Sequence, residues 1–454
     1  MPFIPHTQAD EAEMLATIGA ASVEELFDEV PAALRIDGLE HVAPGLSEMA
    51  VSRRMRQLAA QDGTPLCFAG GGAYEHHIPA AVWQITTRGE FYSAYTPYQA
   101  EASQGTLQVI YEYQTMMANL TAMDVSNASL YDGASSLAEA ILMAVRANRK
   151  SKSQRVLVPD TLNPAYRRTL ETLLAPQQIR IEQLAYDPQS GTVPAAAVAA
   201  WSGEDVAAVV VAQPNYFGQL EDVDGLTDAG HALGAMVIGV VNPMALAILE
   251  PPGRWGSKGV DIVCGEGQPL GVPLSSGGPY FGILCCRQAL VRQMPGRLVG
   301  RTLDLDGKPG FTLTLQAREQ HIRRAKATSN ICTNQGLLVT AATIYMAMLG
   351  AEGLERIATV CHGTTGRLLA ALTSIPGVSL RFDNAARFHE AVVELPRSAV
   401  AVIDALAQDG IVAGVALGAD FDGFDNALLV CATETKTDAD IEQFRSSLEA
   451  ALAA

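Results

Sequence analysis

The middle of the chain alternates between apolar runs and amphipathic stretches. Five runs rich in valine and isoleucine lie between residues 129 and 287, namely RVLVPD, IRIEQLAY, VAAVVVAQP, AMVIGVV and VDIVCGE. The stretches SSLAEAILMAVRANR, PAYRRTLETLLA and LTDAGHALG separate them and have helical character. Strands that are apolar almost throughout are typical of a parallel sheet with helices on both faces. The pattern therefore predicts a doubly wound α/β domain, which binds ligands at the carboxyl ends of its strands.

The two flanking regions have a different pattern. Residues 1–65 are polar and helical, with Thr7 placed as an N-cap and Asp10 three positions later. After residue 330 a long helical stretch leads into the short apolar runs GVSLRF, HEAVVEL, GIVAGVAL and NALLVCAT, and a closing helix is expected at 437–453. We predict an N-terminal helical arm (1–65), a large α/β domain (66–330) and a small α+β C-terminal domain (331–454).

Composition and charge narrow the classes of partner. Hydrophobic residues make up 48% of the 454 residues and charged residues 18%, which indicates a well-packed soluble protein. The formal net charge of -18 disfavours nucleic acid and anionic membranes as main partners, because both repel an acidic chain. The N-terminus lacks the pattern of a signal peptide, and the most apolar window, 235–249, is too short to span a bilayer. We therefore expect a cytoplasmic protein.

The cysteines and histidines predict neither a disulfide framework nor a metal site. The seven cysteines form no CxxC pair, and several of them stand inside apolar strands. They are interpreted as reduced, mostly buried thiols. His76 and His77 are adjacent, so their side chains diverge on a strand or a helix and do not share a metal ion.

Three stretches could carry binding chemistry. In LYDGASSLAEAIL the residues Gly133, Ala134 and Ser135 begin a helix, where backbone amides can approach an anion; plain helix capping explains them equally well. Tyr95 and Tyr98 stand beside a Thr-Pro turn, where they could bind a polar substrate or form a packing surface.

The third stretch is REQHIRRAKATSNICTNQ, the only concentrated cationic segment of this acidic chain. Its cations and hydroxyl groups could bind a phosphate or a carboxylate, and the ordinary alternative is a solvated helix face. The residues singled out here are Arg324, Lys326, Thr328, Ser329 and Asn330.

The segment DIVCGEGQPLGVPLSSGGPYFGILCCR predicts a strand, a glycine-rich turn and a second strand that returns. A Schiff-base enzyme needs a lysine at the mouth of the sheet. This turn carries an amide, Gln268, and contains no lysine between residues 265 and 271. Of the six lysines, Lys258 and Lys326 are placed best to reach a site.

Long strings of this sequence resemble the P-protein family of the glycine cleavage system, in particular the α subunit of its two-subunit form. The strings are TPYQAEASQGTLQVIYEYQTMMANLTAMDVSNASLYDGAS, GEGQPLGVPLSSGGPYFGIL and REQHIRRAKATSNICTNQ. The resemblance implies the aspartate-aminotransferase-like fold of pyridoxal phosphate (PLP) enzymes. It also implies pairing with a homologous β subunit as α2β2, decarboxylation of glycine through PLP, and transfer of the aminomethyl group to the lipoyl arm of H-protein.

The resemblance also implies that this chain holds no cofactor of its own. Gln268 stands where the β subunit has the PLP lysine, and Asn242 stands where such folds place an aspartate against the pyridine nitrogen. We therefore expect PLP on the β subunit, none covalently bound here, and no catalytic residue in this chain. Gly133, Ala134 and Ser135 would then be a vestigial phosphate cup.

By the same resemblance, several residues are candidates for a pocket shared with the β subunit. Tyr95 and Tyr98 would line the glycine or cofactor pocket across the interface, Thr328, Ser329 and Asn330 would help to bind the partner's PLP phosphate, and Arg324 and Lys326 would add charge or guide the lipoyl domain. Two alternatives remain at this point. The chain could be an autonomous PLP enzyme that uses another lysine such as Lys258, or a non-catalytic scaffold that stabilises the β chain.

Overall fold

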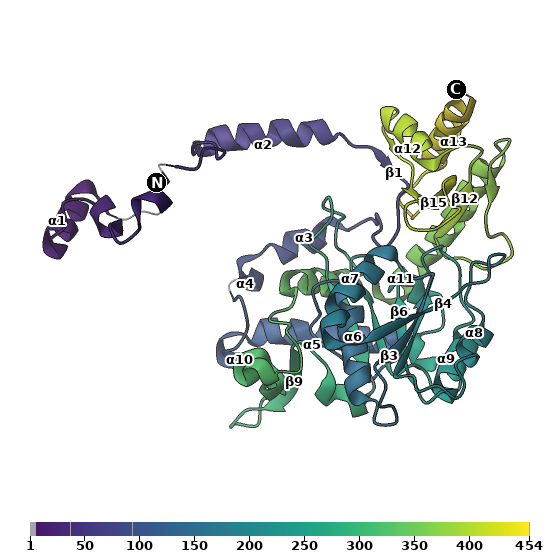
Figure 1. Cartoon of the computed structure of the whole chain (residues 1–454), viewed down its shortest axis with the longest axis horizontal. Helices are drawn as coiled ribbons and strands as arrows, with labels where there is room; N and C mark the ends of the chain where they lie inside the picture. Colours follow the sequence, from purple (N-terminus) through teal and green to yellow (C-terminus); the bar gives the residue numbers. More distant parts are fainter. Residues whose placement is uncertain (1–5, 37, 93, 454) are drawn as a thin grey trace. The chain divides into compact units, whose positions relative to one another are not determined.

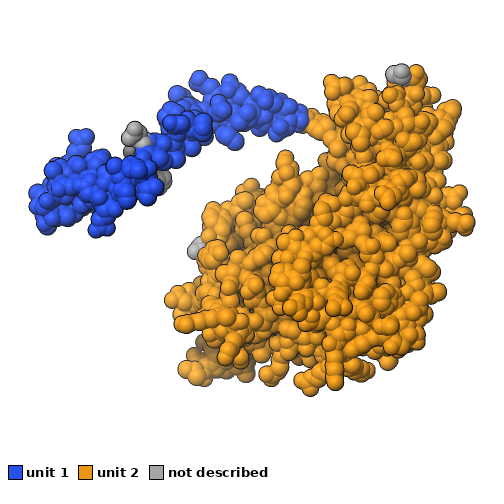
Figure 2. Space-filling view, viewed as in Figure 1, with its two compact units in different colours: residues 1–63 blue, residues 64–454 orange. Residues whose placement is uncertain are grey.

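The computed structural model describes residues 6–36, 38–92 and 94–453. It divides the chain into two compact units, residues 1–63 and 64–454, which are coloured separately in Figure 2. The first unit contains α1 (Gln8–Ile18) and α2 (Glu48–Asp62). The predicted cap of the first helix is confirmed, because Thr7 and Asp10 form a reciprocal capping box. None of the described residues of this unit is buried.

The core of the second unit is a seven-stranded sheet in the order β2-β8-β7-β6-β5-β3-β4. Its strands β3, β4 and β6 are labelled in Figure 1. The five neighbouring strands β7, β6, β5, β3 and β4 are parallel to one another. Strand β8 is antiparallel to β7, and β2 is antiparallel to β8. All five predicted apolar strands are confirmed, as is the strand-turn-strand around residue 268. The strands are β2 (Val125–Ser126), β3 (Arg155–Pro159), β4 (Arg180–Leu184), β5 (Ala208–Gln213), β6 (Met236–Val241), β7 (Ile262–Glu266) and β8 (Gly282–Cys286).

Helices cover both faces of this sheet because its strands are apolar on both sides. One side of β5, with Val209 and Val211, packs in a cluster with Tyr113 and Met117 of α5. Val210, on the other side, belongs to a second cluster with α6 and α7. The helices of this part are α3 (Ala80–Thr86), α4 (Gly89–Tyr92), α5 (Gln104–Thr121), α6 (Gly133–Ala147), α7 (Pro164–Leu174), α8 (Ala195–Ala199), α9 (Val223–Ala232), α10 (Gln320–Arg323) and α11 (Gly336–Thr373).

The C-terminal part contains a separate four-stranded sheet in the order β11-β12-β15-β14. A short parallel pair joins β1 (Leu66–Cys67) to β13 (Ile411–Val412), so the start of the second unit pairs with its C-terminal part. An antiparallel hairpin of β9 (Leu298–Leu303) and β10 (Pro309–Thr314) lies apart from both sheets. The other elements are β11 (Ser379–Leu380), β12 (Glu390–Glu394), β14 (Val415–Ala416), β15 (Ala427–Cys431), α12 (Ala399–Gln408) and α13 (Asp438–Ala453). The predicted domain boundary at residue 330 stays a prediction.

Helix α11 is the longest element, and it is kinked at Gly350, whose φ of 64° lies in the left-handed region. By length and composition alone it could cross a membrane. Half of its most apolar window is buried inside the protein, however, and residues such as Val339, Tyr345 and Leu368 belong to the core. This is the pattern of a core helix.

Candidate functional site

A small cavity lies at the carboxyl ends of β5, β6 and β7, where a doubly wound sheet binds its ligands. Its volume is about 70 Å³, and no lysine is among the described residues that line it. The polar lining residues are Tyr74, Asn163, Tyr166, Asn215, Tyr216, Asn242, Glu266 and Glu390.

Gln268 lies next to this cavity on the turn after β7, and its side chain is 1% exposed. Its Oε1 accepts a hydrogen bond of 2.8 Å from the backbone N–H of Tyr74. Its Nε2 donates to the carbonyl oxygens of Tyr74 at 2.8 Å and Val272 at 2.7 Å. Both amide hydrogens are therefore used, and the side chain ties the turn to the segment that carries Tyr74. An amide is not a nucleophile that forms imines, so Gln268 is structural.

The N-terminus of α6 lies against a carboxyl group of the same chain. Asp132 caps the helix and accepts a hydrogen bond of 2.7 Å from the Ser135 backbone N–H. The Gly133 N–H donates to Glu266 Oε2 at 3.0 Å. A Cβ at Gly133 would overlap the hydroxyl of Tyr166, so only glycine fits there. The helix start at Gly133, Ala134 and Ser135, which is predicted as a vestigial phosphate cup or a plain cap, thus lies against protein side chains.

Two buried carboxyl groups define the electrostatics of the cavity. Burial raises the pKa of Glu266 to about 8, although Glu266 also accepts hydrogen bonds from the N–H groups of Gly133, Gln268 and Phe281. Burial likewise raises the pKa of Glu390 to about 7; it accepts from the Gly71 N–H at 2.6 Å and from the Tyr74 hydroxyl at 2.7 Å. When these groups ionise, the cavity becomes negative and repels anions.

Asn242 follows β6 at the same edge of the sheet. Its Oδ1 accepts from the Met244 N–H at 2.9 Å, and its Nδ2 lies 3.2 Å from His389 Nε2. Burial, and next the neighbouring His76, hold the pKa of His389 well below its usual value. The neutral ring can therefore accept the amide hydrogen of Asn242 through Nε2.

The other sequence candidates lie away from this cavity, because none of them is among its described lining residues. Tyr95 is 85% exposed and Tyr98 is 50% exposed. The Tyr98 ring packs 5.4 Å from the ring of His321 and 5.7 Å from the Arg297 guanidinium, measured to the ring centroid. The tyrosine segment and the cationic segment therefore meet at Tyr98 and His321.

Within the cationic segment, Arg324, Lys326 and Asn330 are exposed, whereas Thr328 and Ser329 are partly buried. The Thr328 N–H donates to the carbonyl oxygen of Arg318 at 3.0 Å, and Ser329 Oγ accepts from the Ile331 N–H at 3.0 Å. These contacts fold the segment into turns that leave Arg323, Arg324 and Lys326 on the surface, whereas Arg318 is partly buried and donates to the carbonyl oxygens of Met294 and Gly296.

Four residues that shape the cavity are not predicted as site residues from the sequence, namely Tyr74, Tyr166, Glu266 and Glu390. Only Glu266 carries a local signal, since it is a carboxylate at the end of an apolar strand, inside the glycine-rich turn. The other three reach the cavity from separate segments, so no spacing in the sequence connects them.

Comparison with solved structures first defines the class. The fold is similar to that of sphingosine-1-phosphate lyase from Burkholderia pseudomallei (16% identity, TM-score 0.66, 92% of this chain and 93% of that chain). It is also similar to glutamate decarboxylase from Lactobacillus brevis (14%, TM-score 0.67, 93% and 96%). The chain has the aspartate-aminotransferase-like fold of PLP-dependent enzymes, which confirms the predicted fold class.

Closer likenesses define the family. The family model described as glycine cleavage system P-protein matches residues 1–448. "Probable glycine dehydrogenase (decarboxylating) subunit 1" from Thioalkalivibrio sulfidiphilus is 63% identical over 453 residues, and that from Nitrosomonas europaea is 60% identical over 454; both matches cover 100% of both chains. A crystal structure of glycine decarboxylase (P-protein), in inhibitor-bound form, is 41% identical with a TM-score of 0.90 over 100% of both chains. This chain belongs to the glycine cleavage system P-protein family, as the resemblance predicted.

Proposed function

We propose that this chain is the cytoplasmic α subunit of a two-subunit glycine decarboxylase and acts only with a β subunit, as α2β2. The β subunit holds PLP, which supplies the electron sink for the decarboxylation of glycine. The aminomethyl group then passes to the lipoyl arm of H-protein. The family match and the curated relatives named subunit 1 support this assignment.

The observation that carries the proposal is that the residues present do not fit PLP. The first amide of α6 donates to Glu266, so an anionic phosphate would meet a carboxyl group there. Gln268 uses both of its amide hydrogens within the protein, and Asn242 is neutral, so it cannot hold a pyridinium proton as a carboxylate does. The cavity of about 70 Å³ is far smaller than the roughly 300 Å³ at the low end of ligand pockets.

The exposed tyrosines and the cationic segment are the groups this chain can offer to a partner. Tyr95 and Tyr98 present hydroxyl groups at the surface, where they can form hydrogen bonds across an interface. Arg324 and Lys326 belong to the cationic segment, which contacts Tyr98 through His321, and both are exposed. In the proposal, these residues, with Thr328, Ser329 and Asn330, complete the β subunit's pocket by positioning glycine and the cofactor phosphate and by excluding water.

The surface of the N-terminal unit also supports the proposal of a partner subunit. It carries many exposed apolar side chains, and a short segment without buried residues lacks the core that would hold it. Packing against another surface would bury these side chains. The exposed ones include Ile18, Phe27, Leu34, Leu39, Val42, Leu46, Met49 and Met55.

The structure argues against the alternative in which Lys258 carries PLP. Lys258 precedes β7 and lies in a surface pocket with Arg149, His231 and Met236. Met236 is the first residue of β6, so this pocket is at the amino ends of the strands. The cavity beside Gln268 is at the carboxyl ends, on the opposite edge of the sheet.

The test is reconstitution with the β subunit and H-protein. Tyr95→Phe and Thr328→Ala should each lower glycine decarboxylation by about tenfold, as expected from the loss of one hydrogen bond of about 1.4 kcal/mol. Tyr92→Phe is the matched control, since Tyr92 is also exposed and should retain full turnover. Borohydride reduction of the complex should trap PLP on the β subunit only. Unchanged turnover in both variants would favour the scaffold alternative, and a PLP adduct on this chain would refute the proposal.

A further inference from the structure

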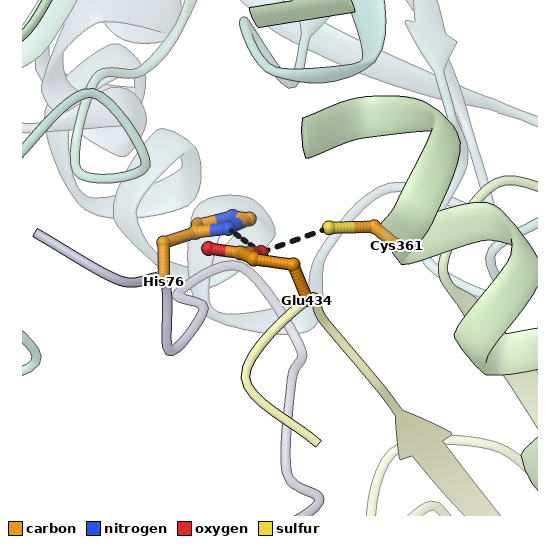
Figure 3. A group of neighbouring side chains, drawn as sticks. All are labelled: His76, Cys361 and Glu434. Carbon is orange, nitrogen blue, oxygen red and sulfur yellow. Dashed lines mark hydrogen bonds and ion pairs between the residues drawn. The ribbon is translucent and has the colours of Figure 1, made fainter. Parts of the chain in front are cut away.

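Three side chains from distant segments meet in one place (Figure 3). His76 comes from the segment between β1 and α3, Cys361 from the second half of α11, and Glu434 from the loop after β15. His76 Nδ1 lies 2.8 Å from Glu434 Oε2, and the Cys361 thiol donates to the same oxygen at 3.1 Å. The three potential ligand atoms all lie within 4.8 Å of one another.

We propose that His76, Cys361 and Glu434 bind one divalent transition-metal ion of the zinc type. The inference goes beyond the proposed decarboxylase function and does not depend on it, because none of the three is among the described residues of the cavity beside Gln268. The sequence predicts that His76 and His77 do not share a metal ion, because the side chains of adjacent residues diverge. Here only His76 belongs to the cluster, and the other ligands come from elsewhere.

The donor set matches the chemistry of zinc. Imidazole nitrogen, thiolate sulfur and carboxylate oxygen are its three ordinary protein ligands, and three protein ligands leave a fourth position for water. A neutral His76, a Cys361 thiolate and a Glu434 carboxylate would balance the two positive charges of the ion. That balance matters at a site where the side chain of His76 is 2% exposed and that of Glu434 is 13% exposed.

The two spacings to Glu434 need only a small adjustment, and the third, between His76 and Cys361, must lie within the same 4.8 Å. Ligand atoms around a tetrahedral zinc ion lie about 3.3–3.7 Å apart, given metal–ligand bonds of about 2.0–2.3 Å. The distances of 2.8 and 3.1 Å to Glu434 Oε2 would therefore lengthen by about 0.5 Å. Binding would replace the thiol proton of Cys361, which leaves to solvent as the metal–sulfur bond forms.

Two further features point to a ligand. Glu434 Oε1 accepts from the His77 N–H at 2.7 Å, which orients the carboxylate as outer hydrogen bonds orient metal ligands. The hydroxyl of Tyr345 is also buried, and it has no hydrogen-bond partner within the described part of the chain. Burial raises the pKa of Tyr345, and the charges of Glu434 and Cys361 raise it further.

The test uses the full-length chain, freed of metal with a chelator and then titrated with Zn²⁺ against a chromophoric indicator. One equivalent of Zn²⁺ should bind and raise the melting temperature. Co²⁺ in its place should give a thiolate-to-metal charge-transfer band in the near ultraviolet. Cys361→Ser should abolish that band and weaken Zn²⁺ binding by more than about 100-fold, since even an outer hydrogen bond contributes about 10–100-fold.

Two matched controls separate this site from adventitious binding. Cys332→Ser removes the exposed cysteine, and His77→Gln removes the neighbouring exposed histidine, so both should bind metal as the unmodified chain does. If Cys361→Ser does not fold, His76→Gln provides the second ligand variant, because its amide can still donate to Glu434. The proposal is wrong if the unmodified chain retains no stoichiometric metal, or if both ligand variants bind Zn²⁺ normally. In either case the three side chains are only a hydrogen-bonded cluster.

Discussion

Replacing Gln268 by methionine tests whether this residue is structural. The substitution keeps the length of the side chain and removes its amide. It leaves the Tyr74 N–H, the Tyr74 carbonyl and the Val272 carbonyl without the only hydrogen-bond partner that each has in the described chain. At about 1 kcal/mol for each hydrogen bond, the free energy of unfolding falls by about 3 kcal/mol, and leaving the buried backbone groups unpaired can double this loss. That is a large share of the about 5–15 kcal/mol that stabilises a typical domain.

Urea unfolding of the full chain, followed by circular dichroism and tryptophan fluorescence, measures this loss. Gln108→Met is the matched control, because Gln108 is exposed on α5 and bonds only to Glu112 among its described neighbours; it should change stability by less than about 0.5 kcal/mol. Gln268→Lys should also fail to trap PLP with borohydride, since Glu266 still lies on the α6 amide and the cavity stays small. A loss below about 1 kcal/mol in Gln268→Met, or a stoichiometric PLP adduct at Lys in Gln268→Lys, would refute the reasoning.

Two further predictions concern the same cavity. The pKa values of Glu266 (about 8) and Glu390 (about 7) lie above the ordinary value of 4.5. Between about pH 4.5 and pH 8 the folded chain therefore keeps protons that the unfolded chain releases. The stability that these bound protons contribute is lost as pH rises through that window. Glu266→Gln and Glu390→Gln should therefore flatten the dependence of the melting temperature on pH, unlike the exposed control Glu355→Gln; an unchanged slope would contradict the raised pKa values. Gly133→Ala should cost about 1–3 kcal/mol by urea unfolding, because its Cβ would lie too close to the Tyr166 ring and hydroxyl and to the Glu266 backbone nitrogen. Tyr166→Phe removes only the hydroxyl and should restore part of this loss; no recovery would show that the hydroxyl is not the main obstacle.

The sheet could be predicted from the sequence because its signal is local. β5, β6 and β7 are nearly continuous apolar runs, and burial on both faces is the physical reason for that pattern, whereas the edge strand β4 keeps polar residues. The order of the strands could not be predicted, nor could the pairing of β2 with β8, since both depend on contacts between distant segments. The kink of α11 was also missed, because one glycine inside a helical pattern does not reveal its φ.

The candidate site was predictable only where one residue type is chemically decisive. Gln268 stands out because an amide cannot replace a Schiff-base lysine, whatever the surroundings. Glu390 and Tyr74 gave no signal, since their 2.7 Å hydrogen bond joins residues 316 positions apart. The same holds for His76 and Glu434, which are 358 positions apart. Such pairs are visible only in the folded chain.

In the proposed function this chain binds no cofactor, and Glu266 and Gln268 then account for how the fold persists without one. A bound cofactor stabilises the folded state and supplies partners for polar groups at the strand ends and at the helix N-terminus. Here two side chains of one turn take over both roles. Glu266 accepts from the α6 amide, and Gln268 satisfies three backbone groups of the Tyr74 segment and its own turn. Because the two residues act on different elements, a lysine at position 268 would leave the first amide of α6 bonded to Glu266. Cofactor binding by this chain would therefore require both side chains to change together.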